Sequence, residues 1–477
     1  MLGHLPRQWM LQASDMPAPK NAIRVHDQFR WTLYANGELV DRACASADRT
    51  VVICGVATQA GDPQASMTDI ASRLALLDND ALERALYDIV GCYVVFAWSG
   101  GTCRILTDPA AALGVYYDPS VPRIASTPLL LGDYPRDPHT NEWFGARPPN
   151  NWVPSPYTIF EDILVLPANH VLDVGTWQVR RFWPTVIDER GRSEAAEWIS
   201  DDLRSAVEAV TRDDRRLHMS LTGGHDSRAN LAAARKVVHR MEFFALRNRG
   251  VSPADIVLAQ RIADAVGVQF RVIDCPNPTP EQLAAYDRQC GLQAFGARRD
   301  IVGGCALVAN GPAIHINGGL GVLLKNFYGA RLGSRSQMVR ISELLTDFDR
   351  PPELIRAAVE QWLSSVRCFP PQLQRTLMYL EQRASRWMGP ADLASTLFYD
   401  PYSPFNSRRI AMAAAFAPDQ MLEGGRLHRA VIAELWPELL EIPFTKARSP
   451  LRRALPRGLK ERLRPLKKLL DAKRRAH

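Results

Sequence analysis

The sequence has no long apolar run, no paired cysteines and no internal repeat. In its 477 residues, no hydrophobic stretch approaches the ~20 residues that a membrane-spanning helix needs, and the first residues lack the apolar core of a secretory signal. The eight cysteines are scattered, without a C-x-x-C pair or a suitably spaced histidine. These absences argue against a membrane-spanning, disulfide-stapled or zinc-binding protein, and they favour a cytoplasmic protein whose cysteines stay reduced.

Positive charge is concentrated at the end of the chain. Residues 446–477 contain thirteen Lys or Arg and two acidic residues, a local net charge of +11, so the rest of the chain carries −4 of the overall +7. From Gly458 this segment has the pattern of a basic amphipathic helix with leucines on one face. We expect that helix to dock on the protein's own body. A membrane surface, nucleic acid or an acidic peptide remain alternatives, and no specific nucleic acid is expected.

One stretch combines a strand, a glycine turn and a helix. An apolar run that ends at Leu221 predicts a buried strand, residues 222–227 form a tight turn, and an alanine-rich helix is predicted for residues 228–238. Gly223 and Gly224 let the backbone approach a ligand closely, and the unpaired amides at the start of a helix attract an anion. The stretch is typical of an anion-binding loop, with an ordinary glycine turn as the alternative.

The same turn carries groups suited to phosphate and to a metal ion. Thr222 and Ser227 add hydroxyl donors, and Asp226 is suited to bind Mg²⁺. The run SLTGGHDS resembles the SGGxDS pyrophosphate loop of the ATP pyrophosphatase (PP-loop) enzymes. Its position behind a long N-terminal region resembles the asparagine synthetase group, which includes asparagine synthetases, beta-lactam synthetases and lasso-peptide macrocyclases. Because the turn lacks the GK[ST] ending of a P-loop, the resemblance implies that ATP is split between its α and β phosphates.

Residues 20–185 are predicted to be mainly β structure, which is typical of stacked antiparallel sheets. The clearest runs are Thr50–Val56, Cys92–Trp98 and Thr102–Thr107. The region also resembles the N-terminal amidotransferase domain of asparagine synthetases, in residues 108–117 and 158–183. The resemblance implies a glutaminase-like antiparallel β-sandwich.

The family's working glutaminase has a cysteine directly after the initiator methionine, because that thiolate is the nucleophile. Here the second residue is Leu2, and the first cysteine is Cys44. We therefore expect the N-terminal domain to be retained as a fold without releasing ammonia from glutamine. The amine nucleophile would then come from elsewhere.

The second half of the chain alternates strands and helices after a polar linker that ends at residue 193. The predicted elements are helix Glu194–Thr211, strand Glu242–Leu246, helix Pro253–Val266, strand Gln269–Ile273 and strand Ile314–Asn317. Such alternation predicts a doubly wound parallel sheet, which the resemblance makes an ATP pyrophosphatase (HUP) sheet with a helical extension. The expected fold is thus a two-domain α/β and α+β protein, with domains 1–185 and 193–445 and a basic segment 446–477.

Two positions after the second strand of this sheet are candidates for contact with ATP. The backbone around Leu246 lies where such folds hold the adenine. Asp255, in the first turn of the next helix, would lie near the nucleotide according to the resemblance, although helix capping by Ser252-Pro253-Ala254-Asp255 explains the same residues.

A second glycine motif follows the strand that ends at Asn317. Gly318, Gly319 and a later Tyr328 resemble the family's second signature, and Lys325 stands where one branch has an arginine. Val322 stands where an acid normally helps to hold Mg²⁺, and an apolar side chain cannot replace a carboxylate. Either the metal relies on Asp226 and the phosphates, or the site is weakened.

Two residues nearer the C-terminus complete the candidate site. The resemblance makes Glu381 the acid that helps to bind the acceptor, with an exposed ion pair to Arg383 or Arg386 as the alternative. Lys446, in a segment that resembles the family's "K.gF..P" run, would neutralise the charge that builds up on the adenylate and the tetrahedral intermediate. Its alternative is a solvated tail lysine.

These observations favour an ATP-dependent, AMP-forming amide ligase with ATP and Mg²⁺ as cofactors. Within the family, the missing glutaminase cysteine favours lasso-peptide-type macrocyclisation, in which a peptide's own amine attacks its adenylated Asp or Glu side chain. A precursor peptide and its leader peptidase would then be partners. The alternatives are an ammonia-dependent asparagine synthetase, which uses a small-molecule carboxylate, and a degenerate nucleotide-binding or scaffold protein, which Val322 would favour.

Overall fold

The structure is a computed structural model. It describes residues 5–36, 40–45, 49–145, 152–187, 191–248, 251–294, 298–309, 311–325 and 352–445, with the side chains of 40–45 and 191–193 left aside. Leu2, Tyr328, Lys446 and the predicted basic tail lie outside these residues. Among the residues described, no helix is long and apolar enough to cross a membrane.

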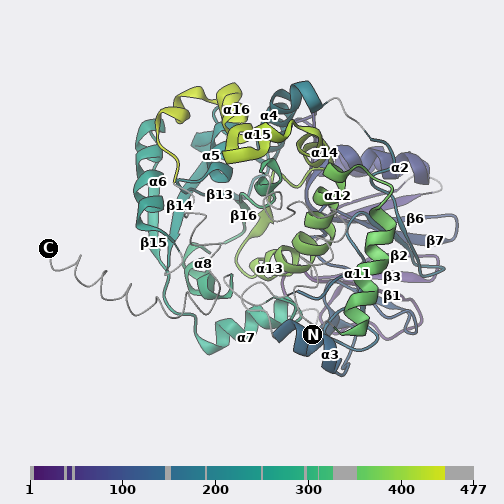
Figure 1. Cartoon of the computed structure of the whole chain (residues 1–477). Coiled ribbons are helices and arrows are strands. Elements are labelled where there is room, and N and C mark those ends of the chain that lie inside the picture. Colours follow the sequence, from purple (N-terminus) through teal and green to yellow (C-terminus); the bar gives the residue numbers. More distant parts are fainter. Residues whose placement is uncertain are drawn as a thin grey trace.

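Two six-stranded antiparallel sheets form the N-terminal part of the molecule, on the right in Figure 1. The first sheet has the order β10 (Leu164–Val165), β8 (Tyr116–Tyr117), β9 (Arg123–Ala125), β1 (Trp9–Ala13), β3 (Trp31–Ala35), β2 (Ile23–Gln28). The second has the order β12 (Gln178–Arg181), β11 (His170–Asp173), β7 (Thr102–Thr107), β6 (Ile89–Ser99), β5 (Thr50–Gln59), β4 (Val40–Ala45). The predicted antiparallel sandwich is confirmed.

Strands β5 and β6 are mostly apolar because both of their faces are buried. Val52 and Phe96 point into the sandwich, where Trp9 of the first sheet contacts the ring of Phe96 edge-on at 4.8 Å. Val51 and Val95 point to the opposite face, toward the helices. Burial on both faces removes the polar alternation of a half-exposed strand.

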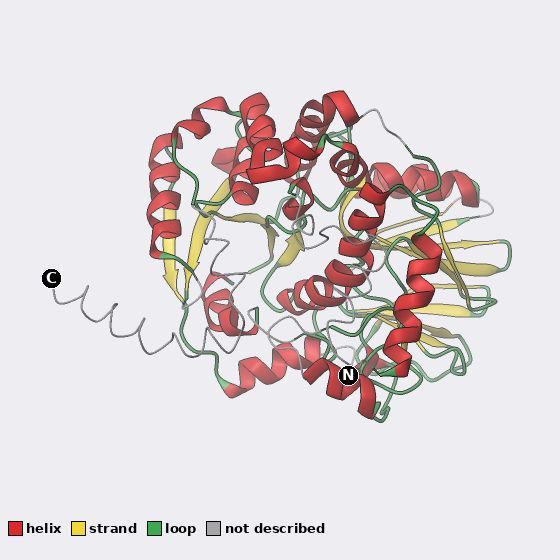
Figure 2. Cartoon of the chain, in the orientation of Figure 1, coloured by secondary structure: helices red, strands yellow, loops and turns green. Residues whose placement is uncertain are grey.

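A five-stranded parallel sheet forms the second part, and Figure 2 shows it flanked by helices. Its order is β15 (Phe270–Asp274), β14 (Met241–Arg247), β13 (Arg216–Ser220), β16 (Ala313–Ile316), β17 (Asp400–Tyr402). One face of it, with Met219 and Ile316, packs in the main core. The other face carries Ser220, Phe244 and His315, which border a cavity. The predicted doubly wound sheet is present, with β17 added at its edge by the helical extension.

The helices occupy three regions of the chain. The N-terminal part has α1 (Met67–Ala75), α2 (Asn79–Ala85) and α3 (Pro138–Gly145). The parallel sheet is accompanied by α4 (Gly191–Val210), α5 (His225–Ala233), α6 (Pro253–Val266), α7 (Pro280–Gln289) and α8 (Val302–Val308). The extension has α11 (Glu353–Val366), α12 (Pro371–Leu377), the π-helix η7 (Met378–Met388), α13 (Gly389–Ser395), α14 (Arg408–Phe416), α15 (Asp419–Leu422) and α16 (Arg426–Leu435). Short 3₁₀ turns are η2 (Leu86–Asp88), η3 (Pro128–Leu130), η4 (Val238–Arg240), η5 (Arg299–Ile301), η6 (Gly321–Leu324), η8 (Glu423–Gly425) and η9 (Pro437–Glu441).

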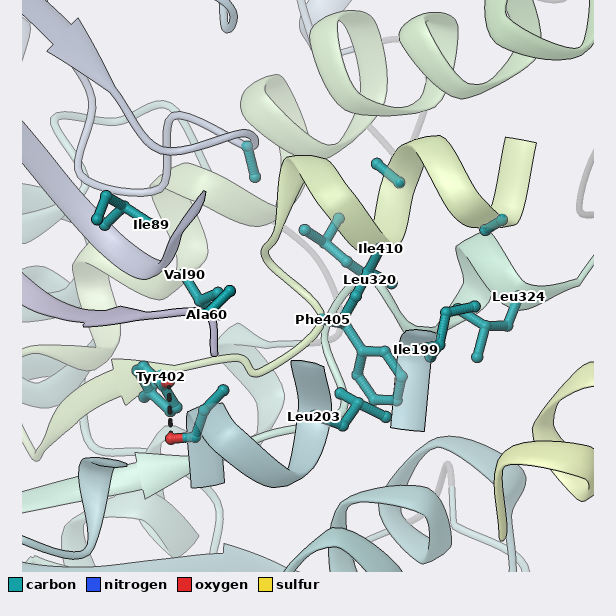
Figure 3. Close-up of a cluster of buried hydrophobic side chains, with 14 of the residues drawn as sticks. Ala60, Ile89, Val90, Ile199, Leu203, Leu320, Leu324, Tyr402, Phe405 and Ile410 are labelled. Carbon is teal, nitrogen blue, oxygen red and sulfur yellow. Dashed lines mark hydrogen bonds between the residues drawn. The ribbon is translucent and has the colours of Figure 1, made fainter. Parts of the chain in front are cut away.

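One hydrophobic core runs from the second antiparallel sheet into the helices around the parallel sheet. Figure 3 shows Ile89 and Val90 of β6, Leu203 of α4 and Phe405 within this core. Tyr402 of β17 is fully buried there, and its hydroxyl lies 2.6 Å from that of Thr58 in β5. The two parts of the fold are therefore joined by apolar packing and not by a linker alone.

Polar anchors also cross between the two parts. Arg408, at the start of α14, is fully buried and donates to Asn169 Oδ1 at 3.1 Å and to the carbonyl of Thr107 at 2.8 Å. Asn406 donates to Asp108 Oδ1 at 2.7 Å. A buried guanidinium needs such partners, so residues 406–408 belong to the packing of the N-terminal sheets.

Candidate active site

A cavity of about 460 Å³ lies over the open face of the parallel sheet, at the carboxyl ends of β13, β14 and β16. This is the size of a small-molecule site, at the edge of an α/β sheet where ligands usually bind. Candidate residues Leu221, Thr222, Asp226, Leu246, Gly318 and Gly319 line it, as does Val322. The structure therefore brings together both glycine motifs and the predicted adenine position.

The loop after β13 is held by its own hydroxyl groups. Ser227 Oγ lies 2.9 Å from Thr222 Oγ1 and accepts the amide of Thr222 at 3.2 Å, while Thr222 Oγ1 accepts the amide of Gly224 at 3.2 Å. Helix α5 starts at His225, three residues earlier than predicted, with Gly224 as an extended N-cap that adds no side-chain bond. The first turn of α5 thus lacks a capping side chain, as an anion-binding helix start requires.

The glycines are needed because neighbouring groups approach them closely. A Cβ at Gly223 would lie 2.8 Å from Cβ of Leu258. Cβ atoms at Gly318 and Gly321 would lie 3.0 Å and 2.8 Å from Cβ of Asp226. The second glycine motif is therefore packed directly against the acidic residue of the first.

Asp226 is held by two basic side chains. Its Oδ1 lies 2.7 Å from Lys325 Nζ and 2.8 Å from Nε2 of the buried His428. Burial raises the pKa of the Asp226 carboxyl, but His428 and Lys325 outweigh that effect and hold the pKa well below its ordinary value. The carboxylate is therefore ionised and already partly neutralised by Lys325. His428 was missed by sequence reasoning, since no local pattern connects it with Asp226.

The predicted Mg²⁺ ligand set is incomplete in the described residues. Asp226 is the one acidic residue among those that line the cavity, and Val322 occupies the position where the resemblance implies a second acid. Within the described ranges, no cluster of three His, Cys, Asp or Glu side chains could hold a metal ion. The described residues therefore offer Mg²⁺ one carboxylate in this cavity, and the ion would take its other ligands from phosphate oxygens and water.

The sheet-facing side of the cavity is polar and aromatic. Arg298 borders it and forms an ion pair with the buried Asp392 at 3.2 Å. His315 packs between Phe244 and Tyr399, with ring centroids 5.4 Å and 4.6 Å away, and burial together with His218 and Arg298 lowers its pKa to about 3. A neutral imidazole and a guanidinium thus face the cavity. The sequence could have predicted that His315 faces the cavity, since it lies two residues before Asn317 on the same face of the strand. No comparable pattern in the sequence points to Arg298.

The chain segment before Lys446 lies on the loop. Thr445 donates its amide to the carbonyl of Gly223 at 2.9 Å, and its hydroxyl is hydrogen-bonded to Asp255. Asp255 therefore contacts this segment, and Ser252, although at the N-cap position of α6, makes no side-chain capping bond. Lys446 follows Thr445 directly in the sequence but is itself outside the described residues.

Glu381, to which the resemblance gives an acceptor-binding role, is not among the residues that line the cavity. It is fully buried at the junction of the two parts, where Arg181 donates to Oε2 at 2.9 Å and the indole of Trp362 donates to the same oxygen at 2.7 Å. The alternative, an exposed ion pair with Arg383 or Arg386, is wrong, because Glu381 is fully buried and forms its ion pair with Arg181 of β12. Arg386 instead donates to the carbonyl of Val153.

Comparison with known proteins gives only distant similarities. No protein-family model matches the sequence, and no curated protein matches it. Similar solved structures include U34-tRNA thiolase NcsA from Methanococcus maripaludis, at 11% identity over 58% of this chain and 73% of that one, with a TM-score of 0.23. Glutamine phosphoribosylpyrophosphate amidotransferase from B. subtilis is 9% identical over 66% and 76%, with a TM-score of 0.24. NH3-dependent NAD synthetase from Campylobacter jejuni is 14% identical over 41% and 84%, with a TM-score of 0.18. Similarity at these TM-scores does not by itself assign a family or a function to the chain.

Proposed function

We propose that the chain is an ATP-dependent, AMP-forming amide ligase that activates a carboxylate and transfers the acyl group to an amine. The observation that carries the proposal is the meeting of two glycine motifs at Asp226, on the rim of a cavity that also includes Leu246 and Arg298. Its lining offers backbone groups for adenine and phosphate, and it also offers a guanidinium and a neutral histidine as polar groups for an acceptor.

The residues suggest how the two steps would be shared. A substrate carboxylate oxygen attacks the α-phosphorus of ATP, and pyrophosphate leaves toward the amides that follow Gly224. Lys325 is close enough to the loop to offset the charge on that leaving group. An amine then attacks the acyl carbon and AMP leaves, with Lys446 proposed to stabilise the negative charge of the tetrahedral intermediate.

A peptide's own amine is the nucleophile that we favour, as in lasso-peptide-type macrocyclisation. Cys54, Cys92 and Cys103 are buried in the second antiparallel sheet, and burial raises the pKa of the Cys92 and Cys103 thiols well above the ordinary value. None of these three is suited to release ammonia from glutamine. A precursor peptide would then be the substrate, and a leader peptidase a functional partner.

Two alternatives remain beside macrocyclisation. An ammonia-dependent asparagine synthetase would use the same cavity with aspartate as the carboxylate. A degenerate nucleotide-binding or scaffold protein is favoured by one observation, the pairing of the lone carboxylate Asp226 with Lys325 while Val322 replaces the second acid.

The test is carboxylate-dependent exchange of labelled pyrophosphate into ATP, screened over aspartate and over peptides with a free N-terminal amine and an Asp or Glu side chain. A peptide that supports exchange and becomes lighter by one water supports macrocyclisation, whereas exchange with aspartate and ammonia supports the synthetase. Asp226→Ala should abolish exchange. Asp274→Ala is the matched control, because Asp274 is an exposed acid that pairs with Arg247 at the end of β15. If the protein binds nucleotide but no carboxylate supports exchange, the result would favour the alternative of a degenerate nucleotide-binding or scaffold protein.

A further inference from the structure

Arg228 is a fully buried arginine that directly follows the phosphate loop. Within the described part of the chain, no carboxylate pairs with it. Its guanidinium instead donates to the carbonyl oxygens of Leu439 at 3.1 Å, Ile442 at 2.5 Å and Pro443 at 2.9 Å. The ring of Phe444 lies 3.8 Å from its central carbon. All four partners belong to one short segment more than 200 residues away along the chain.

A buried charge without a counter-charge is unfavourable unless its donors are satisfied. Burial, together with the nearby Arg429, lowers the pKa of Arg228 to about 10. Backbone carbonyl dipoles and the face of an aromatic ring offset that cost. These partners are available to Arg228 only while the segment Leu439–Thr445 lies against α5.

The same segment contacts the phosphate loop at two further points. Thr445 donates its amide to the carbonyl of Gly223 at 2.9 Å, and Arg228 Nη2 reaches that oxygen at 3.5 Å. Phe444 stacks on His225, the first residue of α5, with ring centroids 4.2 Å apart and an angle of 11° between the rings. The segment therefore covers the loop from Gly223 to His225 on the side of its carbonyl group.

Holding this carbonyl has a consequence for the phosphate side of the loop. The carbonyl of Gly223 and the amide of Gly224 belong to one planar trans peptide, so fixing the direction of the first fixes the direction of the second. In the structure that amide points to Thr222 Oγ1 at 3.2 Å, within the loop. Neither glycine has a side chain that could hold the peptide plane in place.

We propose that Arg228 is a positioning residue that docks the segment Leu439–Thr445 onto the phosphate loop, and that this docking fixes the peptide plane between Gly223 and Gly224, and with it the shape of the loop that receives pyrophosphate. The loop is then built from two distant parts of the chain, and it reaches its binding geometry only when the C-terminal segment is in place. The docking itself stands on the contacts above, while the role of the loop in pyrophosphate release rests on the proposed function.

The first experiment measures docking without catalysis, by amide hydrogen exchange of wild type and Arg228→Met. Faster exchange across residues 439–445 in Arg228→Met is expected, and unchanged exchange there would overturn the proposal. Arg235→Met is the matched control. Arg235 pairs with Glu438 at 3.1 Å and lies over Trp436, so it contacts the neighbouring residues of the chain without reaching the loop. Its exchange pattern at 442–445 should match wild type.

The second experiment uses inorganic pyrophosphate as the probe, in calorimetric titrations. Arg228→Met should weaken pyrophosphate binding by about tenfold or more, and Arg228→Lys by less, because an ammonium keeps the charge but has fewer donors in a different geometry. A loss that is equal for Arg228→Met and Arg235→Met would overturn the proposal. If Arg228→Met does not fold, Arg228→Lys takes its place in the comparison with wild type.

The third experiment is a double-mutant cycle with Thr445→Val, which removes the hydroxyl bonded to Asp255. If both residues act through one docked segment, the double variant Arg228→Met/Thr445→Val should lose no more pyrophosphate affinity than the worse single variant. Additive losses would contradict a shared docking role. Failure of the proposed ligase reaction would appear separately, as absent pyrophosphate exchange in the wild type with docking and pyrophosphate binding intact.

Discussion

Lys325 Nζ lies 2.7 Å from Oδ1 of Asp226, and that contact joins two motifs that are 99 residues apart in the sequence. Both side chains are about one-third exposed. The ammonium of Lys325 therefore contacts the carboxylate that was predicted to hold Mg²⁺. Under the proposed function, Lys325 would exchange Asp226 for phosphate oxygens when ATP binds.

Replacement of Lys325 tests this role. Lys325→Met should lower the rate of pyrophosphate exchange by on the order of a hundredfold, as the loss of one preorganised charge does, and Lys325→Arg should retain most of it. The ATP concentration dependence of exchange should be measured for each variant. If Lys325→Met exchanges pyrophosphate as fast as wild type, Lys325 takes no part in the reaction.

Gly223→Ala should damage the loop for steric reasons. The added Cβ would lie 2.8 Å from Cβ of Leu258 and would also press on the hydroxyl of Thr445. We expect ATP-dependent exchange to fall at least about tenfold, with a loss of roughly 1–3 kcal/mol in the free energy of unfolding from overpacking. Gly145→Ala is the control, since a Cβ there meets nothing within 4 Å. Equal activity of the two variants would show that the loop can accommodate a Cβ at position 223.

Glu381→Gln separates an interface role from acceptor binding. Removal of the charge leaves Arg181 buried without its counter-charge, so the free energy of unfolding should fall by about 3 kcal/mol or more. The KM for the carboxylate substrate should stay within about twofold of the wild-type value, because a residue that does not contact the substrate does not change its binding. Chemical denaturation and exchange kinetics on the same protein give both values. A large rise in KM with an unchanged free energy of unfolding would show that Glu381 takes part in substrate binding.

His315 gives a testable pH dependence of stability. Its pKa is about 3 in the folded protein and about 6.5 in an unfolded chain, so between these values the unfolded state binds a proton that the folded state does not. The free energy of unfolding should therefore decrease as the pH falls from about 6.5 toward 3, by up to about 1.4 kcal/mol per pH unit from this residue. His315→Gln should show a shallower slope than wild type in denaturant titrations between these limits. Parallel slopes would show that His315 is free to take up a proton in the folded state.

Local patterns predicted those elements whose boundaries are set by nearby residues. Helix α6 runs over Pro253–Val266, the predicted range, because Pro253 fits its first position and Gly267 ends it in the left-handed conformation at φ 72°. The start of α5 was misplaced by three residues. The glycine turn was predicted to run through Ser227, but Gly224 is extended and the helix begins directly after it.

The contacts that complete the site depend on parts of the chain that are far apart. His428 is 202 positions from Asp226, and Arg228 reaches a segment 211 to 215 positions away. Glu381 shows why its local sequence misled. Arg383 and Arg386 are two and five positions from it, which are not the spacings that pair side chains on a helix, and Glu381 is instead buried against Arg181, which comes from β12, 200 positions earlier in the chain.

The burial of Arg408 in the N-terminal sheets has a consequence for the order in which the protein is made. A ribosome releases β1 to β12 long before Arg408, yet Arg408 is the donor to Asn169 Oδ1 and to the carbonyl of Thr107. Until α4 and β17 are synthesised, the helix-facing side of β5 also lacks its packing against them. The N-terminal sheets therefore complete their packing only after most of the chain has been synthesised, and a pause in translation before these elements are made would leave part of that apolar face open to aggregation.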